Sequence, residues 1–226
     1  MENGHSFDFA GERLVARASG ALHWPARDVL VVSDLHLGKS ERIARRDGRL
    51  LPPYEVTDTL RRLQDDILAT GPHHVISLGD SFDDLAAATA LSGDHRDWIA
   101  RLTTGRDWTW ITGNHDPAPA GLPGQSEDCL ALGPLTFCHI ATGPAGFHGD
   151  RFEISGHYHP KAQLSVRGRP VSRPCFLRDA HRLIMPAYGT YTGGLQSRDA
   201  ALADLMGAGA RAILAGQPMV EIPMPR

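Results

Sequence analysis

The chain has 226 residues, of which 42% are hydrophobic and 22% charged, and its formal net charge is -3. A chain of this length and composition buries roughly 70% of its unfolded surface in an ordinary core, and its charge excludes the strongly basic balance of an obligate nucleic-acid binder. No apolar run approaches the roughly 20 residues that span a bilayer, and no N-terminal stretch resembles a secretion signal, so we expect a cytoplasmic protein without a membrane partner.

Five apolar, strand-like runs follow one another along the chain, each bounded by turn residues. They cover residues 28–34, 73–80, 107–116, 135–140 and 151–159. Apolar residues at helical spacing lie between the first three runs, over 53–69 and about 94–104, and residues 162–191 are again rich in strand signals. This order predicts an α/β protein whose functional residues gather at the carboxyl ends of its strands.

The three cysteines of the chain are widely spaced. Cys129, Cys138 and Cys175 form no Cys-x-x-Cys pair, and their number is odd. The sequence therefore predicts neither a disulfide framework nor a zinc knuckle, and a reducing compartment is the expected environment.

Each strand-like run ends in polar residues that can bind a metal ion. On an extended backbone, residues two positions apart point to the same side, so each D-x-H or H-x-H pair is expected to aim two side chains at one point. The residues at the five ends are Asp34 and His36, Asp80, Asn114 and His115, His139, and His157 with His159.

Leaving His115 aside, this set offers two carboxylates, one amide oxygen and four imidazoles, without a thiolate. Such donors suit Mn²⁺, Fe²⁺ or Zn²⁺. Seven groups exceed the needs of one ion, whereas two ions that share a carboxylate would use all of them. Two ions about 3.5–4 Å apart clamp an in-line displacement at phosphorus and turn a bridging water into a hydroxide nucleophile.

The ordered motifs resemble those of the calcineurin-like metallophosphoesterases. They are D-x-H at 34–36, G-D-x-x-D-D at 79–84, G-N-H-D at 113–116, a single histidine at 139 and G-H-x-H at 156–159. The resemblance implies a four-layer α/β/β/α sandwich with a dinuclear site. We expect one domain over residues 1–226, with a motif core at 28–160 and a β-hairpin-rich part at 161–226.

Further segments are similar to the ligase-associated DNA damage response endonucleases, the PdeM subfamily. They include LPPYE at 51–55, GHYHPKAQL at 156–164 and SRPCFLRDAHRLIMPAYGTYTGGL at 172–195. This similarity implies a manganese-dependent phosphodiesterase or endonuclease acting on DNA, as single strands or damaged ends, with a repair helicase, ligase and exonuclease as partners. A small-molecule phosphodiesterase and a low-turnover repair scaffold are the alternatives, and the intact ligand set speaks against the scaffold.

The resemblance also assigns roles to the site residues. His115 would stabilise charge on the scissile phosphate or protonate the leaving oxygen, and Asp116 would orient its ring. His148 is an alternative to His139 as a ligand of the second ion, and we favour His139 because it ends an apolar strand. The role of Asp83 is left open. The first ion would take Asp34, His36 and His159, the second would take Asn114, His139 and His157, and Asp80 would bridge them.

Cationic residues near these motifs are candidate phosphate contacts. Lys161 follows the last histidine pair and is the better candidate, whereas Arg42 and Arg45 fit a solvated helix face equally well. The tyrosines of PAYGTYTGGL could form a wall of the substrate cleft, but we favour a packed loop that closes the sheet. The arginine clusters are Arg42, Arg45, Arg46 and Arg49, and then Arg167, Arg169 and Arg173, of which the second group is interpreted as the guarded edge of a hairpin.

Overall fold

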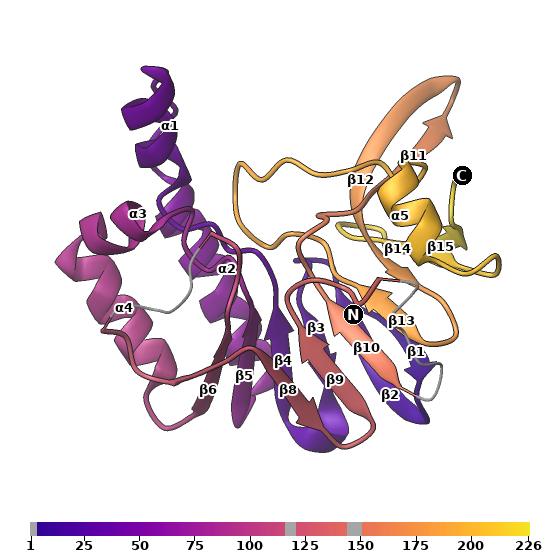
Figure 1. Ribbon diagram of the computed structural model, residues 1–226, viewed down its shortest axis with the longest axis horizontal. Helices are drawn as coiled ribbons and strands as arrows, with labels where there is room; N and C mark the ends of the chain where they lie inside the picture. Colours follow the sequence, from indigo (N-terminus) through magenta and orange to yellow (C-terminus); the bar gives the residue numbers. More distant parts are fainter. Residues whose placement is uncertain (1–3, 116–120, 144–150) are drawn as a thin grey trace.

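The structure, a computed structural model, describes residues 4–115, 121–143 and 151–226. Two β-sheets pack face to face, and the longer helices cover the outer side of the first sheet (Figure 1). The first sheet has the strand order β1 to β7: β1 (Gly4–Phe9), β2 (Glu12–Arg17), β3 (Leu22–Trp24), β4 (Val29–Val32), β5 (His74–Leu78), β6 (Asp107–Ile111) and β7 (Gln125–Glu127).

The second sheet has the order β15-β14-β12-β13-β10-β9-β8, and β11 joins it only through β12. Strands β4 to β7 run parallel, as do β9, β10 and β13, whereas the remaining pairs are antiparallel. The strands are β8 (Cys129–Leu132), β9 (Leu135–Cys138), β10 (Phe152–Ser155), β11 (Lys161–Val166), β12 (Arg169–Arg178), β13 (Arg182–Ile184), β14 (Arg211–Leu214) and β15 (Val220–Pro223).

The helices are distributed unevenly over the two sheets. The core between the sheets joins side chains such as Phe7 and Phe137, while a second core packs α2 and α4 on the outer face of the first sheet. Among the described residues, α5 is the only helix packed in the third core, outside the second sheet. The helices are α1 (Lys39–Asp47), α2 (Glu55–Thr70), α3 (Leu85–Ala90), α4 (Gly93–Thr103) and α5 (Ala200–Leu205).

The predicted mixed α/β fold is confirmed. The five strand-like runs contain β4, β5, β6, β9 and β10, and the two helical patterns coincide with α2 and α4. Helix α2 forms because Val56, Leu60, Leu63 and Ile67 share its buried face, and it ends at Gly71, whose φ is 58°. The antiparallel strands β1 to β3 were not predicted, although Phe7 and Phe9 alternate with polar residues there.

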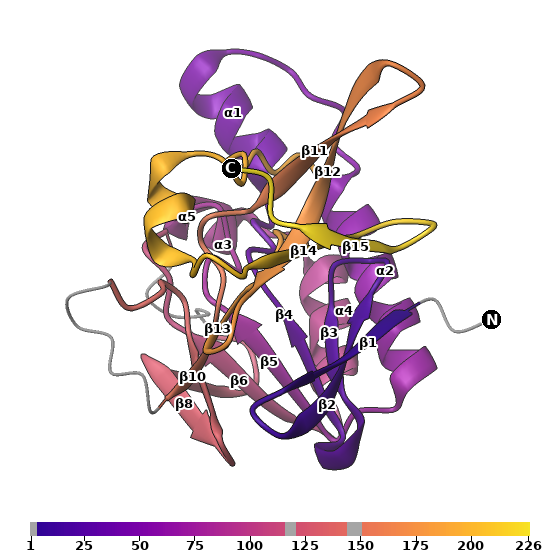
Figure 2. The same ribbon diagram turned by 90° about the vertical axis from the view of Figure 1, so that its right-hand side faces the viewer.

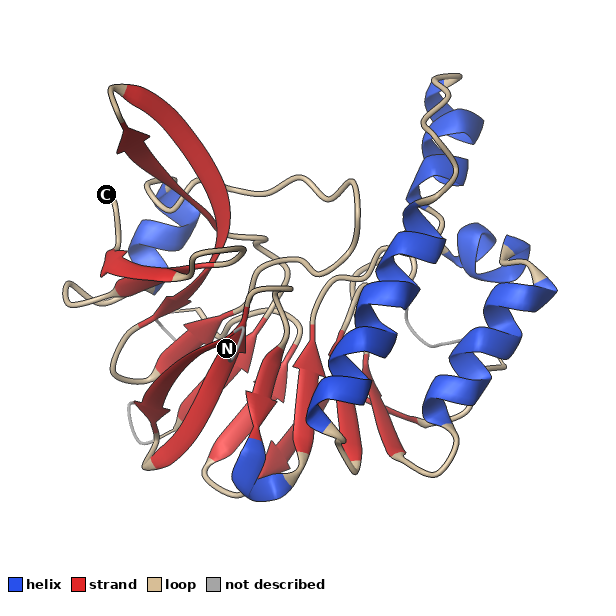
Figure 3. Ribbon diagram, turned by 180° about the vertical axis from the view of Figure 1, so that it is seen from behind, coloured by secondary structure: helices blue, strands red, loops and turns tan. Residues whose placement is uncertain are grey.

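Two elements project from the same end of the molecule. Helix α1 and the hairpin formed by β11 and β12 rise on opposite sides, and the views of Figures 1, 2 and 3 agree on this. The loop over 185–197 crosses between them (Figure 1). This end also carries the segments that follow β4, β5, β6, β9 and β10.

Candidate metal centre

The predicted ligands meet where parallel strands of both sheets end. The segment after β4 is tied to that after β5, because the backbone N–H of Asp34 donates to the Gly79 carbonyl over 3.2 Å. The sheets are joined here as well, since the backbone N–H of His157 donates to Asp34 Oδ2 over 2.9 Å. The carboxyl ends of the strands therefore form one site, as open α/β sheets favour.

The backbone that aims the ligands is not extended, which corrects one expectation. Positive φ angles of 44° to 70° occur at Asp34, His36, Asp80, His157 and His159. The segments after β4, β5 and β10 turn into the left-handed region just beyond their strands, so the D-x-H and H-x-H pairs converge without the alternation of an extended chain. Left-handed backbone costs a non-glycine residue roughly 1–2 kcal/mol, which the surrounding hydrogen bonds must offset.

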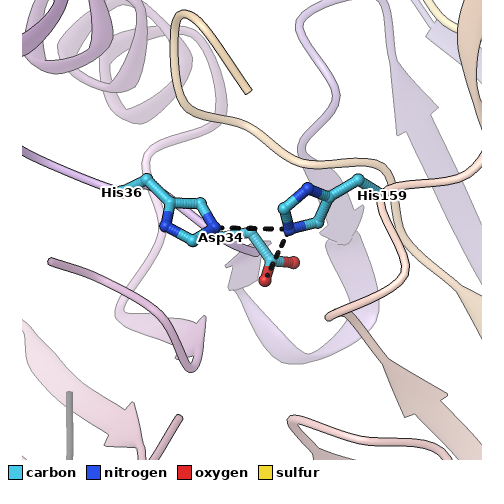
Figure 4. A group of neighbouring side chains, drawn as sticks. All are labelled: Asp34, His36 and His159. Atoms are coloured by element: carbon cyan, nitrogen blue, oxygen red, sulfur yellow. Dashed lines mark hydrogen bonds and ion pairs between the residues drawn. The ribbon is translucent and has the colours of Figure 1, made fainter. Parts of the chain in front are cut away.

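Asp34, His36 and His159 form the first group of converging atoms (Figure 4). The Nε2 atoms of His36 and His159 are 3.3 Å apart, and His159 Nε2 lies 3.1 Å from Asp34 Oδ1. Asp34 is completely buried, and its Oδ1 accepts no hydrogen bond from the described residues. A buried carboxylate oxygen that faces two imidazole nitrogens is suited to a cation.

Asp80, His139 and His157 form the second group, and Asn114 lies beside it. His139 Nε2 lies 3.0 Å from Asn114 Oδ1, 3.4 Å from Asp80 Oδ2 and 3.3 Å from His157 Nδ1. Gly79 makes room for this arrangement, since a Cβ atom there would collide with the His139 ring. Four donor atoms from four loops thus share one small volume.

Asp80 lies between the two groups. Its Oδ2 atom is 3.4 Å from Nε2 of His139 and 3.9 Å from Nε2 of His36, and its Oδ1 accepts the backbone N–H of His115 over 2.9 Å. One carboxylate oxygen therefore faces one histidine of each group, which is the position that a bridging ligand requires.

Polar contacts on the far side of two rings fix which nitrogen faces the site. His139 Nδ1 donates to the Leu78 carbonyl over 2.8 Å, and His36 Nδ1 lies 2.8 Å from Asp83 Oδ1. Nε2 of both rings then points inward, toward carboxylate and amide oxygens and the ring nitrogens of other histidines. A divalent cation satisfies such a set of ligand atoms, so the residues fit divalent metal ions.

Electrostatics lead to the same conclusion. Burial alone raises the pKa of Asp80, but His139 and the backbone N–H of His115 outweigh it and lower this pKa to about 2. Burial likewise raises the pKa of Asp34, and His159 and His139 outweigh it, so this pKa is lowered. Burial and the neighbouring His139 lower the pKa of His157. At neutral pH the carboxylates are ionised and His157 is neutral, which are the forms that bind metals.

The pKa of His139 is shifted in the opposite direction to that of His157. Burial lowers its pKa, but the carboxylates of Asp80 and Asp34 outweigh burial, so the pKa of His139 is raised. In the metal-free protein, a proton on His139 supplies the positive charge that these carboxylates demand.

Asp83, whose role the sequence left open, holds His36 from behind. Its side chain is completely buried, and its Oδ1 lies 2.8 Å from His36 Nδ1. The same carboxylate binds Lys39 over 3.3 Å and Arg42 over 3.0 Å. Its backbone carbonyl accepts from His115 Nδ1 over 2.8 Å, so one residue orients both His36 and His115. Sequence spacing does not show these contacts, because they come from three separate segments.

His115 lies beside the first group. Its ring is edge-on to that of His36, with centroids 5.3 Å apart, and it is half-buried. Its Nδ1 donates to the Asp83 carbonyl over 2.8 Å, so Nε2 is the nitrogen that this contact leaves free. Asp116, the predicted orienting group, and His148, the alternative ligand, lie outside the described residues.

The candidate phosphate contacts fall into two kinds. Lys161 and His159 line the same surface pocket, whose volume is about 170 Å³. Arg42 is bound to Asp83, and Arg45 is bound to Glu41 over 2.9 Å and to Asp84 over 3.0 Å. The pocket is lined by His159, Lys161, Ser172, Pro174, Ala187, Thr192 and Gly193.

The other residues singled out in the sequence do not belong to the candidate metal groups of the described residues. Tyr188 is buried and donates to Asp66 Oδ2 over 2.8 Å, in agreement with a packed loop, whereas Tyr191 stacks at a tilt on the exposed Tyr54. Within the described residues, no candidate metal group includes His5, His23, His73, His74, His95 or His181.

The prediction of a chain without a disulfide is wrong. Cys129 of β8 and Cys138 of β9 lie directly opposite each other and form a disulfide, immediately before His139. The β8–β9 hairpin brings them into register, which their spacing alone does not reveal. Cys175 is free, and burial raises the pKa of its thiol to about 12. Among the described residues, no helix is both long and apolar enough to cross a membrane.

Comparison with known proteins gives a family and a structural relative. The model of the calcineurin-like phosphoesterase family matches residues 28–178. A nuclease from Pseudomonas putida, named MPE, is 28% identical, with a TM-score of 0.77 over 97% of this chain and 100% of that chain. A phosphoesterase from E. coli is 12% identical, with a TM-score of 0.44 over 87% of this chain and 99% of that chain. No curated protein sequence matches the chain.

Proposed function

Because this chain belongs to the calcineurin-like phosphoesterases, we propose that it is a two-metal phosphodiesterase that cleaves DNA as an endonuclease. Family membership makes it a metal-dependent phosphoesterase. The observation that carries the two-metal proposal is the position of Asp80 Oδ2, which faces His36 of one ligand group and His139 of the other. DNA is the proposed substrate because the Pseudomonas putida relative, similar over nearly the whole chain, is a nuclease.

The proposed ligand sets follow from these two groups of converging atoms; a third candidate group, His36, Asp83 and His115, shares His36 with the first. When bound, the two ions supply Lewis acidity and an activated water for attack at phosphorus. Manganese is the proposed metal, and Fe²⁺ or Zn²⁺ would suit the same donors. We assign the first ion to Asp34, His36 and His159, the second to Asn114, His139 and His157, and the bridging position to Asp80.

The protein's own groups prepare the site before substrate arrives. Asp83 and the Leu78 carbonyl hold the His36 and His139 rings in one tautomer, so the ligand nitrogens need no reorientation. His115 presents Nε2, from which a proton can pass to the leaving oxygen. Lys161 places a cation beside His159, where a substrate phosphate would lie.

A small-molecule phosphodiesterase is the second candidate, favoured by the modest volume of the pocket beside His159. The repair helicase, ligase and exonuclease, and the cytoplasmic location, stay predictions. A scaffold of low turnover is the third reading, which the complete ligand set disfavours.

One experiment separates these functions. The protein is incubated with Mn²⁺ and, in parallel, with single-stranded DNA and with bis-p-nitrophenyl phosphate. Hydrolysis of both substrates supports the proposal, and hydrolysis of the small ester alone favours the second candidate. If metal binds but neither substrate is hydrolysed, the scaffold is favoured. His115→Ala should retain metal and lose most activity, whereas Asp80→Asn should lose metal. The control is His73→Ala, because that side chain is 72% exposed and lies at the opposite end of β5 from Asp80.

A further inference from the structure

The hairpin formed by β11 and β12 has an unusual charge. Residues 161–178 contain five cationic side chains and no carboxylate, in a chain whose net charge is -3. Two of the five are occupied: Arg173 donates to the carbonyls of Ala215 and Pro218, and Arg178 binds Glu221 over 2.7 Å. The other three, which have no side-chain partner in the described part of the chain, are Lys161, Arg167 and Arg169.

These three cations are placed at the base and at the tip of the hairpin. Lys161 lies at the base and shares a pocket with His159. Arg167 and Arg169 are exposed at the tip, where the hairpin stands clear of the rest of the molecule (Figures 1 and 2). Six residues of β11 at about 3.3 Å each separate base and tip by roughly 20 Å.

The turn at the tip favours a functional interpretation. Arg167 and Gly168 both have positive φ, 51° and 76°. Two-residue turns of this kind prefer Asn-Gly, because a bulky residue pays about 1 kcal/mol or more for a left-handed backbone. An arginine at this position places a charge at the outermost point of the hairpin against its backbone preference, and such outliers cluster at functional sites.

We propose that the β11–β12 hairpin is a phosphate-binding arm for the nucleic-acid strand that leaves the metal centre. Lys161 contacts a phosphate beside the cleaved bond, and Arg167 and Arg169 contact phosphates further along the strand. This assignment rests on the proposed cleavage of DNA. The competing explanation is that the arginines only prevent pairing at the free edge of β11.

The test compares two double variants that remove equal charge. Arg167→Ala/Arg169→Ala removes the tip cations, and Arg61→Ala/Arg101→Ala removes two exposed cations from α2 and α4. For each protein, kcat/KM is measured on a single-stranded 20-mer and on bis-p-nitrophenyl phosphate, in Mn²⁺, between 50 and 200 mM KCl.

We expect the tip variant to lower kcat/KM for the 20-mer relative to the ester. The slope of log kcat/KM against log salt should become about 1.4 less negative, which is roughly 0.7 for each phosphate contact on a single strand. Arg167→Lys/Arg169→Lys should restore most of the slope, because the charge is retained. The α2 and α4 variant should match the wild type.

Three outcomes would overturn the arm. If the tip variant and the control have equal slopes of log kcat/KM against log salt, the hairpin does not bind phosphates, and the proposed cleavage of DNA still stands. If kcat/KM falls equally for the 20-mer and for the ester, the substitutions act by disturbing the fold and not by removing phosphate contacts. Aggregation of the tip variant, seen by light scattering, with an unchanged slope would favour edge protection. Wild-type hydrolysis of the ester without the 20-mer would instead overturn the proposed function, and the DNA arm with it.

Discussion

Helix α1 and the β11–β12 hairpin begin within a few residues of the metal ligands and carry similar numbers of arginines, yet the arginines of α1 are paired with carboxylates and, within the described residues, those at the hairpin tip are not. On α1, Arg42 binds Asp83 and Arg45 binds Glu41 and Asp84. On the hairpin, Arg167 and Arg169 have no carboxylate partner among the described residues. A paired cation must exchange one anion for another before it binds phosphate, whereas a free one only releases counterions. The number of cations in a segment therefore does not measure its affinity for DNA.

The largest effect is expected when the carboxylate of Asp83, which binds Lys39 and Arg42 of α1, is removed. Asp83→Ala should destabilise the protein by about 3 kcal/mol, because it leaves Lys39 and Arg42 without their buried partner. Metal affinity should fall about 10- to 100-fold, since His36 loses its support. Thermal unfolding and metal titration by calorimetry measure the two effects.

Asp84→Ala is the control for that variant, since Asp84 also binds α1 arginines but touches no ligand. It should cost about 1 kcal/mol through the lost cap of α3 and leave metal affinity unchanged. Equal metal affinity in both variants would contradict the role given to Asp83.

Removing one α1 arginine gives a smaller and more specific effect. Arg42→Ala should lower hydrolysis of the ester and of DNA by the same factor, severalfold, because Arg42 acts through Asp83 and His36. Its salt slope should equal that of the wild type. The rates of hydrolysis of both substrates are measured at two salt concentrations. A loss of rate on DNA alone would mean that Arg42 contacts the substrate directly.

The pH dependence of stability offers a third test. Burial raises the pKa of Asp83, but His36, Lys39 and Arg42 outweigh it, so the folded-state pKa is lowered. The stabilisation is then fully present above the unfolded-state pKa of about 3.9 and is lost as the pH falls below it. In metal-free protein, Asp83→Asn should weaken the fall in unfolding free energy between pH 5 and pH 2, measured by urea titration. An unchanged fall would mean that Asp83 is not the responsible carboxylate.

The smallest effect is expected at the hairpin tip. Arg167→Gly should stabilise the protein by about 1 kcal/mol at most, because glycine adopts a positive φ without strain. Thermal unfolding measures the gain, and Arg169→Gly, in a strand position, is the control and should not stabilise. If Arg167→Gly is neutral or destabilising, the turn is not strained and that part of the argument for the arm fails.

The sequence predicts the strands that carry the site because buried parallel strands read as short β-branched runs, as in residues 29–32 and 74–78. Their polar ends are visible for the same reason. The contacts of Asp83 could not be predicted, since they join residues from three segments, and neither could the pairing of Cys129 with Cys138. Both depend on how distant loops meet, and no local pattern encodes that.

The left-handed ligand segments have a further consequence, a trade-off between stability and activity. At most positions glycine is less stable than alanine by about 0.5–1 kcal/mol, yet at His157, whose φ is 70°, the order should be reversed. An inactive chain with glycine at such positions would unfold at a higher temperature than one with alanine. Selection for heat resistance alone, without selection for turnover, would therefore tend to erase this metal centre.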